Sequence, residues 1–484
     1  MRTRRITSAR LPSTAAVVMP AMAALAVFNS RAVLASNLNI NGALKMDDYS
    51  YSDLNLNSAS PNNRDFLETN AQLGIAIDGV SLKQLEEPKL DNTTMDAVLK
   101  LHAIGVTNSG IETGSTASGV LGSQPFKQIS ENYPAVDYSP FVENAYVDIK
   151  DPYGVPLKMT IGRQSFKLGS GMILDDDGAV FDGARVQATL PWWEIKTQAF
   201  AFVTHDAHYA VPDNLGLYGF GADLPVQKKK GDLQLNELVE KDNPAAPVPV
   251  EGCINPGPSC ATTKSFKSFT DLEYDIDWGH LSFNGEAALE RGEGSGVAPT
   301  PAHITYQGDA EMLDFKWTQP LYHLKEPGIA RIIISRGSGD RGGSGGIDGA
   351  FFPSHGHQFN GLARDGYGNF FGATPYSAFG GNYSSGTTSG LAAGTSGIDT
   401  VGVGITPPAW HGLVLDAGYY LFQADQVLSG SRTLGTEWDA DIHYDIRQHL
   451  TLEASMGLFK AGTASETTGS GSANVYSFLA VGRF

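Results

Sequence analysis

Alternation of apolar and polar side chains along nearly the whole chain constrains the fold more than any other feature. In LGTEWDADIHYDI, residues 434–446, one parity is apolar apart from Thr436, and the other carries four carboxylates. The same period of two recurs in many segments between Leu67 and Leu458. This period is typical of a β-strand with one apolar and one polar face. The sequence therefore predicts an all-β fold.

The N-terminus predicts export. Several arginines precede the apolar run AAVVMPAMAALAVF, which is followed by AVLA and then SN. A basic segment, a short apolar segment and small residues are the layout of a cleaved signal peptide. A retained membrane anchor is the alternative, but a spanning helix needs about 20 apolar residues. We therefore expect residues 1–35 to be a cleaved signal peptide and residues 36–484 to form the mature protein.

Charge and hydropathy limit which kinds of partner and which cellular compartments fit the chain. The formal net charge is −18, whereas nucleic-acid binding needs a basic surface. Beyond the N-terminus, no segment approaches the roughly 18 continuous apolar residues of a membrane helix. We therefore expect no nucleic-acid partner and no helical membrane span. The exported chain is predicted to be either soluble or a membrane β-barrel.

Connections between the predicted strands differ in length. WGH near Trp278 and RQH near Arg447 are short, whereas residues 205–265 and 337–395 are long, rich in Gly, Pro and Ser, and without periodicity. Short periplasmic turns and long extracellular loops are typical of transmembrane antiparallel β-barrels. At about 10 residues per strand, the mature chain accommodates roughly 16–18 strands around an aqueous channel. A soluble β-sandwich also alternates, but its long loops need not gather at one end.

The last residues, NVYSFLAVGRF, form another amphipathic segment. Tyr476, Phe478 and Phe484 share one face of it. A final amphipathic strand that ends in Phe resembles the assembly signal of bacterial outer-membrane proteins. We therefore expect the bacterial outer membrane as the location, and its lipid and the barrel assembly machinery as partners. The alternative is a soluble edge strand that happens to end in Phe.

The two cysteines lie close together in CINPGPSC, as Cys253 and Cys260. In an exported protein, a close pair predicts a local disulfide that stiffens a loop. No C-x-x-C-H motif is present, so the sequence encodes no site for a covalently attached c-type haem. DDDG at 175–178 and HGH at 355–357 lack the further ligands of a calcium or zinc site, and we interpret them as loop motifs. We expect no cofactor and no metal.

Three stretches carry a family resemblance. Residues 141–186 include IGRQSFKLGSGMILDDDG, residues 335–361 include GIDGAFFPSHGHQFNG, and residues 434–462 run from LGTEWDADIHYDI to GLFKAG. Together they resemble the alginate-export family of outer-membrane β-barrel porins. The resemblance implies a barrel of about 18 strands that passively conducts a solute or a polysaccharide across the outer membrane. In the alginate exporter the constriction is rich in Arg, which suits a polyuronate.

Charged residues of the predicted strands are the candidate lining of the lumen. The cations are Lys158, Arg163, Arg185 and Lys196. The acids are Asp271, Glu273, Asp275, Asp277, Glu286, Glu290, Glu437, Asp439, Asp441 and Asp445. Carboxylates at alternate positions of a strand lie about 6.6–7 Å apart, so their potentials add. These acids depart from an Arg-rich constriction: they solvate the wall, favour cations, or form a specific ligand site.

We therefore predict an outer-membrane channel, and not an enzyme, that passes a hydrophilic solute or polysaccharide passively through a water-filled, carboxylate-rich lumen. One alternative is a barrel that sheathes a partner cytochrome for electron transfer across the membrane. The other is an outer-membrane enzyme on a barrel scaffold. Gly342-x-Ser344-x-Gly346 matches a nucleophile elbow only formally, because it has no strand–turn–helix context.

Overall fold

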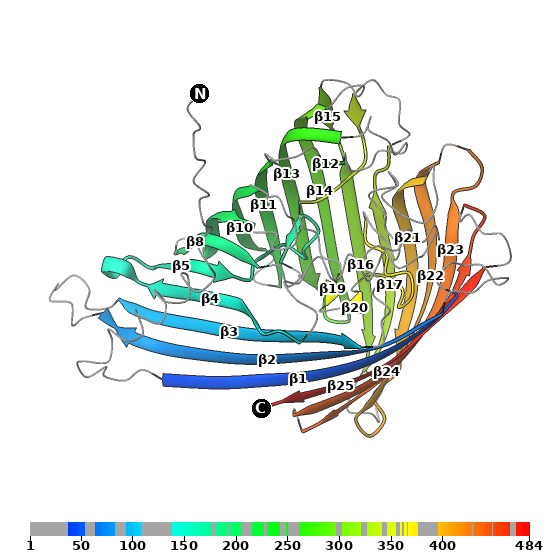
Figure 1. The fold of residues 1–484 in the computed structure, drawn as a ribbon, viewed down its shortest axis with the longest axis horizontal. Coiled ribbons are helices and arrows are strands. Elements are labelled where there is room, and N and C mark those ends of the chain that lie inside the picture. Colours follow the sequence, from blue (N-terminus) through cyan, green and yellow to red (C-terminus); the bar gives the residue numbers. More distant parts are fainter. Residues whose placement is uncertain are drawn as a thin grey trace, which may run out of the picture.

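The chain forms a closed antiparallel β-barrel, seen here in a computed structural model (Figure 1). Eighteen strands of the described residues pair in a ring, each antiparallel to both neighbours. The ring closes where β1 (Asn37–Ser52) pairs with β25 (Ser472–Arg483). The structure describes residues 37–484 except 54–62, 83–92, 108–137, 177–179, 192, 205–214, 227–229, 243–247, 250–260, 297–302, 321–326, 341–345, 355–358, 361–362, 365, 376–394, 428, 448 and 465–470.

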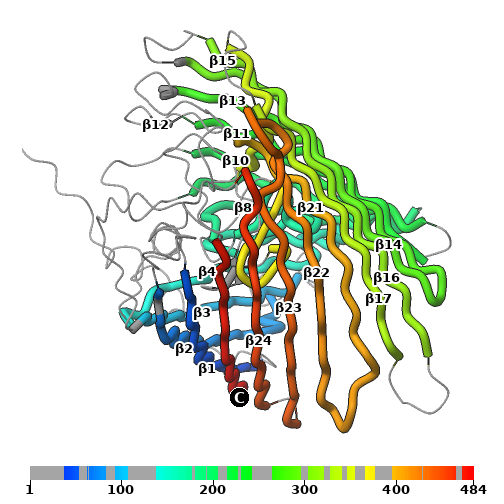
Figure 2. Tube along the Cα trace, turned by 90° about the vertical axis from the view of Figure 1, so that its right-hand side faces the viewer, coloured from blue at the N-terminus to red at the C-terminus, as the bar shows by residue number. Residues whose placement is uncertain are grey.

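Sixteen barrel strands lie between β1 and β25. They are β2 (Arg64–Ser81), β3 (Thr94–Thr107), β4 (Phe141–Lys150), β5 (Leu157–Gln164), β8 (Phe181–Leu190), β9 (Ile195–Val203), β10 (Gly216–Val226), β11 (Gly231–Asp242), β13 (Ala261–Asp277), β14 (Leu281–Gly296), β16 (Asp309–Gln319), β17 (Gly328–Gly337), β21 (Thr395–Thr406), β22 (Leu413–Val427), β23 (Thr433–Ile446) and β24 (Leu450–Ala461). The connections contain β6 (Lys167–Leu168), β7 (Leu174–Asp175), β12 (Val248–Pro249), β15 (Ile304–Tyr306), β18 (Ile347–Asp348), β19 (Phe359–Asn360), β20 (Ala363–Arg364) and the short helix η4 (Pro152–Gly154). The longest barrel strands are β2, with 18 residues, and β13, with 17 (Figures 1 and 2).

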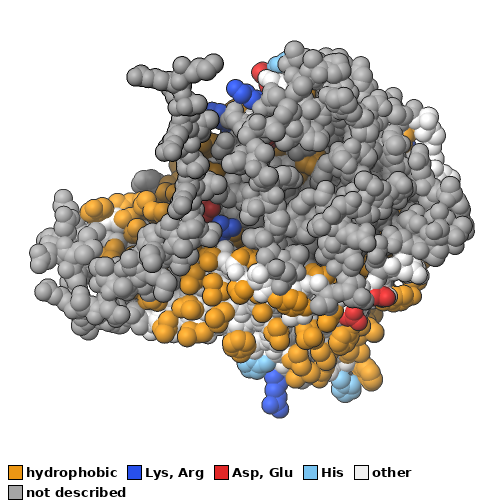
Figure 3. All heavy atoms as spheres, viewed as in Figure 1, with side chains coloured by type: hydrophobic (Ala, Val, Ile, Leu, Met, Phe, Trp, Pro, Cys, Tyr) orange, Lys and Arg blue, Asp and Glu red, His pale blue; other side chains and the backbone are white. Residues whose placement is uncertain are grey.

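Each strand turns one parity outward and the other into the lumen, as the alternation predicts. On β23, Trp438 is 61% exposed and Ile442 is 43% exposed, whereas Glu437 is fully buried. Figure 3 shows apolar side chains gathered over the lower part of the molecule, where Figure 1 places β1 and β25. An apolar outer wall around a polar interior fits a barrel surrounded by lipid. Within the described ranges, no helix is long and apolar enough to cross a membrane.

Short and long connections lie at opposite ends of the barrel. Turns of three or four residues join β8 to β9, β10 to β11, β13 to β14 and β23 to β24 at one end. Exposed tryptophans ring the outside of this short-turn end: Trp193, Trp278, Trp317 and Trp410. Residues 108–140, 165–180 and 338–394 connect strands at the other end. The long loop predicted at 337–395 agrees with the last of these connections.

The long loop predicted at 205–265 is wrong, because β10 and β11 and the start of β13 lie within it. On β10, Tyr218 and Phe220 point outward, whereas the inward positions that follow each of them are occupied by glycine. A Cβ atom on Gly219 would lie 2.6 Å from the Phe200 ring, and one on Gly221 would meet neighbouring amide side chains. Glycine therefore leaves space for inward side chains of adjacent strands, and it hides the alternation of β10.

Two segments from the long-loop end fold into the lumen. Residues 166–176, called the hairpin because β6 pairs with β7, bury Phe166 and Ile173 in a cluster with inward side chains such as Phe202 and Phe269. Residues 366–375, called the strap, bury Phe370 and Phe371 against the opposite part of the wall. That second cluster includes Tyr49, Phe66, Phe422 and Phe459. The hairpin and the strap therefore narrow the barrel from two sides.

Residues 1–35, Cys253 and Cys260 lie outside the described residues. The cleaved signal peptide and the local disulfide therefore stay predictions.

Candidate functional site

The predicted acids of β13 and β14 lie on the inner wall. Asp271, Glu273 and Glu286 are almost fully buried, Asp275 is half-buried, and Asp277 is exposed at the short-turn end. Glu273 and Glu286 are direct cross-strand neighbours. This brings three carboxylates together at mid-height of one part of the wall.

Neutral amides contact these acids. Asn236 Nδ2 donates to Asp271 (2.9 Å). Asn284 Nδ2 donates to Glu273 (3.0 Å) and to Asp275 (2.6 Å). Gly169 of the hairpin, at φ +57°, lies over the buried acids, because a Cβ atom there would approach one oxygen of each to 2.7–3.3 Å. The hairpin therefore covers the acids with its backbone, and the charge of its Lys167 acts on Glu273 and Glu286 without a direct ion pair.

Glu290, further along β14, does have a cation. Lys267 Nζ lies 3.1 Å from Glu290 Oε1, and the backbone N–H of Phe352 donates to Glu290 Oε2 (2.7 Å). Phe352 belongs to the 338–394 connection, so Glu290 ties that connection to the wall. Asp348 of the same connection is nearly fully buried. Burial, and then the charge of Glu290, raise the pKa of Asp348 well above its usual range.

The predicted acids of β23 hold the strap. Glu437 accepts hydrogen bonds from the backbone N–H groups of Phe370 and the residue after it (2.5 and 3.0 Å). Asn369 donates its backbone N–H to Asp439 (3.0 Å) and its side-chain amide to Asp441 (2.8 Å). Successive backbone N–H groups of this kind form an anion-binding concavity. These carboxylates therefore anchor a loop inside the barrel.

Asp445, also on β23, lies by the short turn and accepts a hydrogen bond from Thr451 Oγ1 (2.6 Å). The structure does not bring the two acidic rows together, because β16, β17, β21 and β22 separate β14 from β23. The predicted acids therefore form two groups with different partners.

Three of the four predicted cations line the inner wall of β5, β8 and β9. Each contacts a polar side chain of an adjacent strand: Lys158–Asp148 (2.8 Å), Arg185–Gln198 (2.7 Å) and Lys196–Asp223 (3.0 Å). The Arg185 guanidinium also lies 4.9 Å from the centre of the Phe166 ring of the hairpin. This side of the lumen is therefore mixed in charge.

The prediction that Arg163 lines the lumen is wrong. Arg163 pairs across the sheet with Ala145 and Asp182, and it shares the parity of Ile161, which is 47% exposed on the outer wall. Its guanidinium lies 3.5 Å from the Asp182 carboxylate. The pair sits where β5 ends and β8 begins, beside the long loops.

Sequence analysis missed other charged groups of the inner wall. Arg331 makes a two-pronged contact with Asp314 (2.6–3.0 Å), and Lys316 lies 3.7 Å from the same carboxylate. His102 lies 2.9 Å from Glu143. Asp314 and Lys316 alternate with apolar residues in EMLDFKW, so the period of two could have found them.

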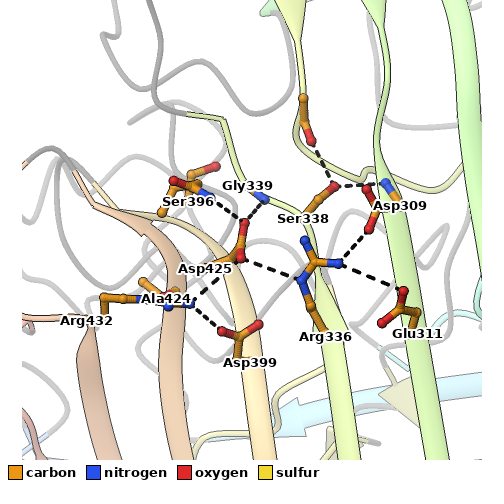
Figure 4. A network of polar contacts seen from close by, with 12 residues as sticks. Asp309, Glu311, Arg336, Ser338, Gly339, Ser396, Asp399, Ala424, Asp425 and Arg432 are labelled. Atoms are coloured by element: carbon orange, nitrogen blue, oxygen red, sulfur yellow. Dashed lines mark hydrogen bonds and ion pairs between the residues drawn. The ribbon is translucent and has the colours of Figure 1, made fainter.

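A network of ion pairs and hydrogen bonds joins the two ends of the 338–394 connection (Figure 4). Asp425 accepts the backbone N–H of Gly339 (2.8 Å) and lies 3.6 Å from Arg336 and 3.7 Å from Arg432. The backbone N–H of Asp340 donates to Ser396 Oγ (3.0 Å). The connection is therefore fixed where it leaves β17 and where it returns at β21.

In the described ranges, no group of three or more His, Cys, Asp or Glu side chains is arranged to hold a metal ion. No protein-family model matches the chain, and no curated protein matches its sequence. The resemblance to the alginate-export family therefore has no support from these comparisons.

Solved structures do match over nearly the whole chain. A BenF-like porin from Pseudomonas fluorescens Pf-5 has a TM-score of 0.51 at 11% identity, covering 93% of this chain and 98% of that one. Pseudomonas aeruginosa OccK9 (OpdG) has a TM-score of 0.54 at 10% identity (92% and 98%). Acinetobacter baumannii OccAB1 has a TM-score of 0.52 at 9% identity (92% and 96%). The chain therefore has the eighteen-stranded fold of bacterial outer-membrane porins, and its apolar outer wall suits that membrane.

Proposed function

We propose that the protein is a passive channel for small hydrophilic solutes in the outer membrane, and not an enzyme. One observation carries the proposal: a closed ring of eighteen described strands has an apolar outer face and an ionic inner face. Barrels of this size leave an aqueous channel instead of a packed interior. The hairpin and the strap then narrow that channel, so we expect it to pass small solutes and to exclude large ones.

Passage of an anionic polysaccharide, as in the alginate-export family, is the second candidate. Only the sequence resemblance supports it. The acidic row of β13 and β14 would repel a polyuronate, because Glu286 and Asp271 have no cation beside them among the described residues. A sheath for a cytochrome would need a wide bore, and the strap and the hairpin occupy the bore. We therefore favour a small solute.

Planar-bilayer recording tests this function. Purified barrel, verified by a gel shift on boiling, should insert in discrete conductance steps in potassium chloride. Liposomes that contain it should swell in small sugars and not in large ones. Boiled protein is the control. Folded barrel that gives neither conductance nor swelling would exclude a channel.

A further inference from the structure

One part of the inner wall carries more carboxylates than cations. It is formed by β11, β13, β14 and β16, which are consecutive in the ring. Its inward acids are Asp232, Asp271, Glu273, Asp275, Asp277, Glu286 and Asp314. We call this surface the acidic track.

The spacing along the track is regular. Alternate residues on β13 repeat every 6.6–7 Å, by about 3.3–3.4 Å per residue. Asp232 lies directly across from Asp275, and Glu286 directly across from Glu273. The carboxylates therefore form a row that repeats at a regular distance of about 6.6–7 Å along the strands.

Counter-charge along the track is sparse. Among the described side chains, only Asp314 of the track forms ion pairs, with Arg331 (2.6 Å) and Lys316 (3.7 Å). Lys167 of the hairpin pairs with Asp175 (3.5 Å), and its charge also acts on Glu273 and Glu286 without a direct ion pair. In the part of the chain that the structure describes, the other acids of the track receive hydrogen bonds only from the neutral amides of two asparagines.

Glu286 gives an independent indication of a missing cationic partner. It is 1% exposed, and neither of its carboxylate oxygens receives a hydrogen bond from any described residue. Its carboxyl group lies against that of Asp271, of which one oxygen also lacks a donor. Two buried carboxyl groups in contact are costly unless a proton or a cation neutralises them, and a bound ammonium group would replace that proton.

The lower end of the track opens into a cavity at the short-turn end. Its volume is about 270 Å³, and its lining includes the acids Asp232, Asp275, Asp277 and Asp314, the amide of Asn284, and the cations Lys230 and Lys316. This space is sufficient for a short chain of methylene groups that carries an amine at each end.

We propose that the acidic track binds a linear di- or polyammonium solute, with one ammonium group in the cavity beside Asp232, Asp275 and Asp277 and the next directed along β13 towards the buried acids under the hairpin. A four-carbon diamine places its nitrogens about 6 Å apart when extended, from five bonds of about 1.5 Å each. Each ammonium group has three donors, which suit carboxylate oxygens on neighbouring strands. The inference rests on the proposed channel function, because it names the solute of that channel.

The test is bilayer recording with butane-1,4-diamine or spermidine on the short-turn side. The diamine should block the potassium current transiently, with butylamine and succinate as matched probes that block at least tenfold more weakly. The double variant Asp275→Asn, Asp277→Asn and the single variant Glu286→Gln should each weaken the block at least tenfold. Asp445→Asn is the control, because it removes a lumen acid at the same end but outside the track.

Each outcome decides a different claim. Equal block in wild type and in the track variants, or equal block by succinate, overturns the inference and leaves the channel intact. Absent conductance overturns the channel function instead, and diamine binding to the detergent-solubilised barrel, measured by calorimetry, then tests the track directly. A variant that shows no gel shift on boiling is replaced by Asp275→Asn alone, which removes a half-buried carboxylate and leaves the buried cluster unchanged.

Discussion

Glu437→Ala should release the strap from the inner wall. Glu437 accepts two backbone hydrogen bonds, from Phe370 and the following residue, and it is fully buried. A hydrogen bond to a charged group contributes about 1.5–3 kcal/mol, so the substitution should weaken attachment of the strap by about 3–6 kcal/mol. The two freed N–H groups are left without an acceptor, which weakens the attachment of the strap further.

Other contacts oppose this loss. The two strap phenylalanines contribute about 1.5–3 kcal/mol each by burial, and Asn369 keeps its bonds to Asp439 and Asp441. The strap should therefore not be lost permanently. A loss of 3 kcal/mol multiplies the detached population by about 100-fold or more, so detachment should become frequent enough to observe.

Single-channel recording measures the effect. The variant should show larger and noisier conductance than the wild type, and protease should cut within the 338–394 connection more readily. Glu437→Gln keeps one carbonyl acceptor and should be intermediate. Asp445→Ala is the matched control, because Asp445 lies on the same face of β23 and accepts a hydrogen bond from Thr451 instead of from the strap. Wild-type conductance and protease resistance in Glu437→Ala, in a barrel that still resists unfolding until boiled, would refute the anchoring role of Glu437.

Three further predictions concern the β1–β25 pair that closes the barrel and the 338–394 connection. Gly42→Leu should reduce the fraction of heat-shifting barrel on a gel, because a Cβ atom at Gly42 would lie 2.2 Å from the Phe484 ring beside the closing β1–β25 pair. Deleting Phe484 should lower outer-membrane levels, since its backbone exchanges two hydrogen bonds of 3.0 Å with Gly42; normal levels would contradict this. The raised pKa of Asp348 means that docking of its connection is favoured in acid and weakens as pH rises from 3.8 towards the raised value. Proteolysis of that connection should therefore increase with pH, and Asp348→Asn should remove the dependence.

The period of two predicts the wall where the two faces differ in chemistry. Residues 434–446 show this, since Trp438 and Ile442 are exposed and Glu437 is buried as their parities require. The prediction failed for β10, where inward glycines conceal the polar face. The prediction that Arg163 lines the lumen also failed, because it rested on the charge of the side chain and not on its parity. Its neighbour Ile161 placed it on the outer wall, and the end of β5 lets a charged pair with Asp182 stand there.

Parity places the carboxylates inside the barrel, but it does not reveal what they contact. The partners of Glu437 lie 66 and 67 residues away in the chain, and no local pattern records such pairing. The one local sign is glycine: Gly368 has φ +86°, and a Cβ atom there would lie 2.5 Å from Glu437 Oε2. Two acidic rows of similar composition thus differ physically. Backbone N–H groups of the strap and the side-chain amide of Asn369 donate to the row on β23, whereas the row on β13 and β14 has two neutral amides and a glycine above it. Among the described residues, Glu286 of the second row has no donor on either oxygen, whereas on β23 one oxygen of Asp439 lacks one, so the second row is the better site for a cationic solute.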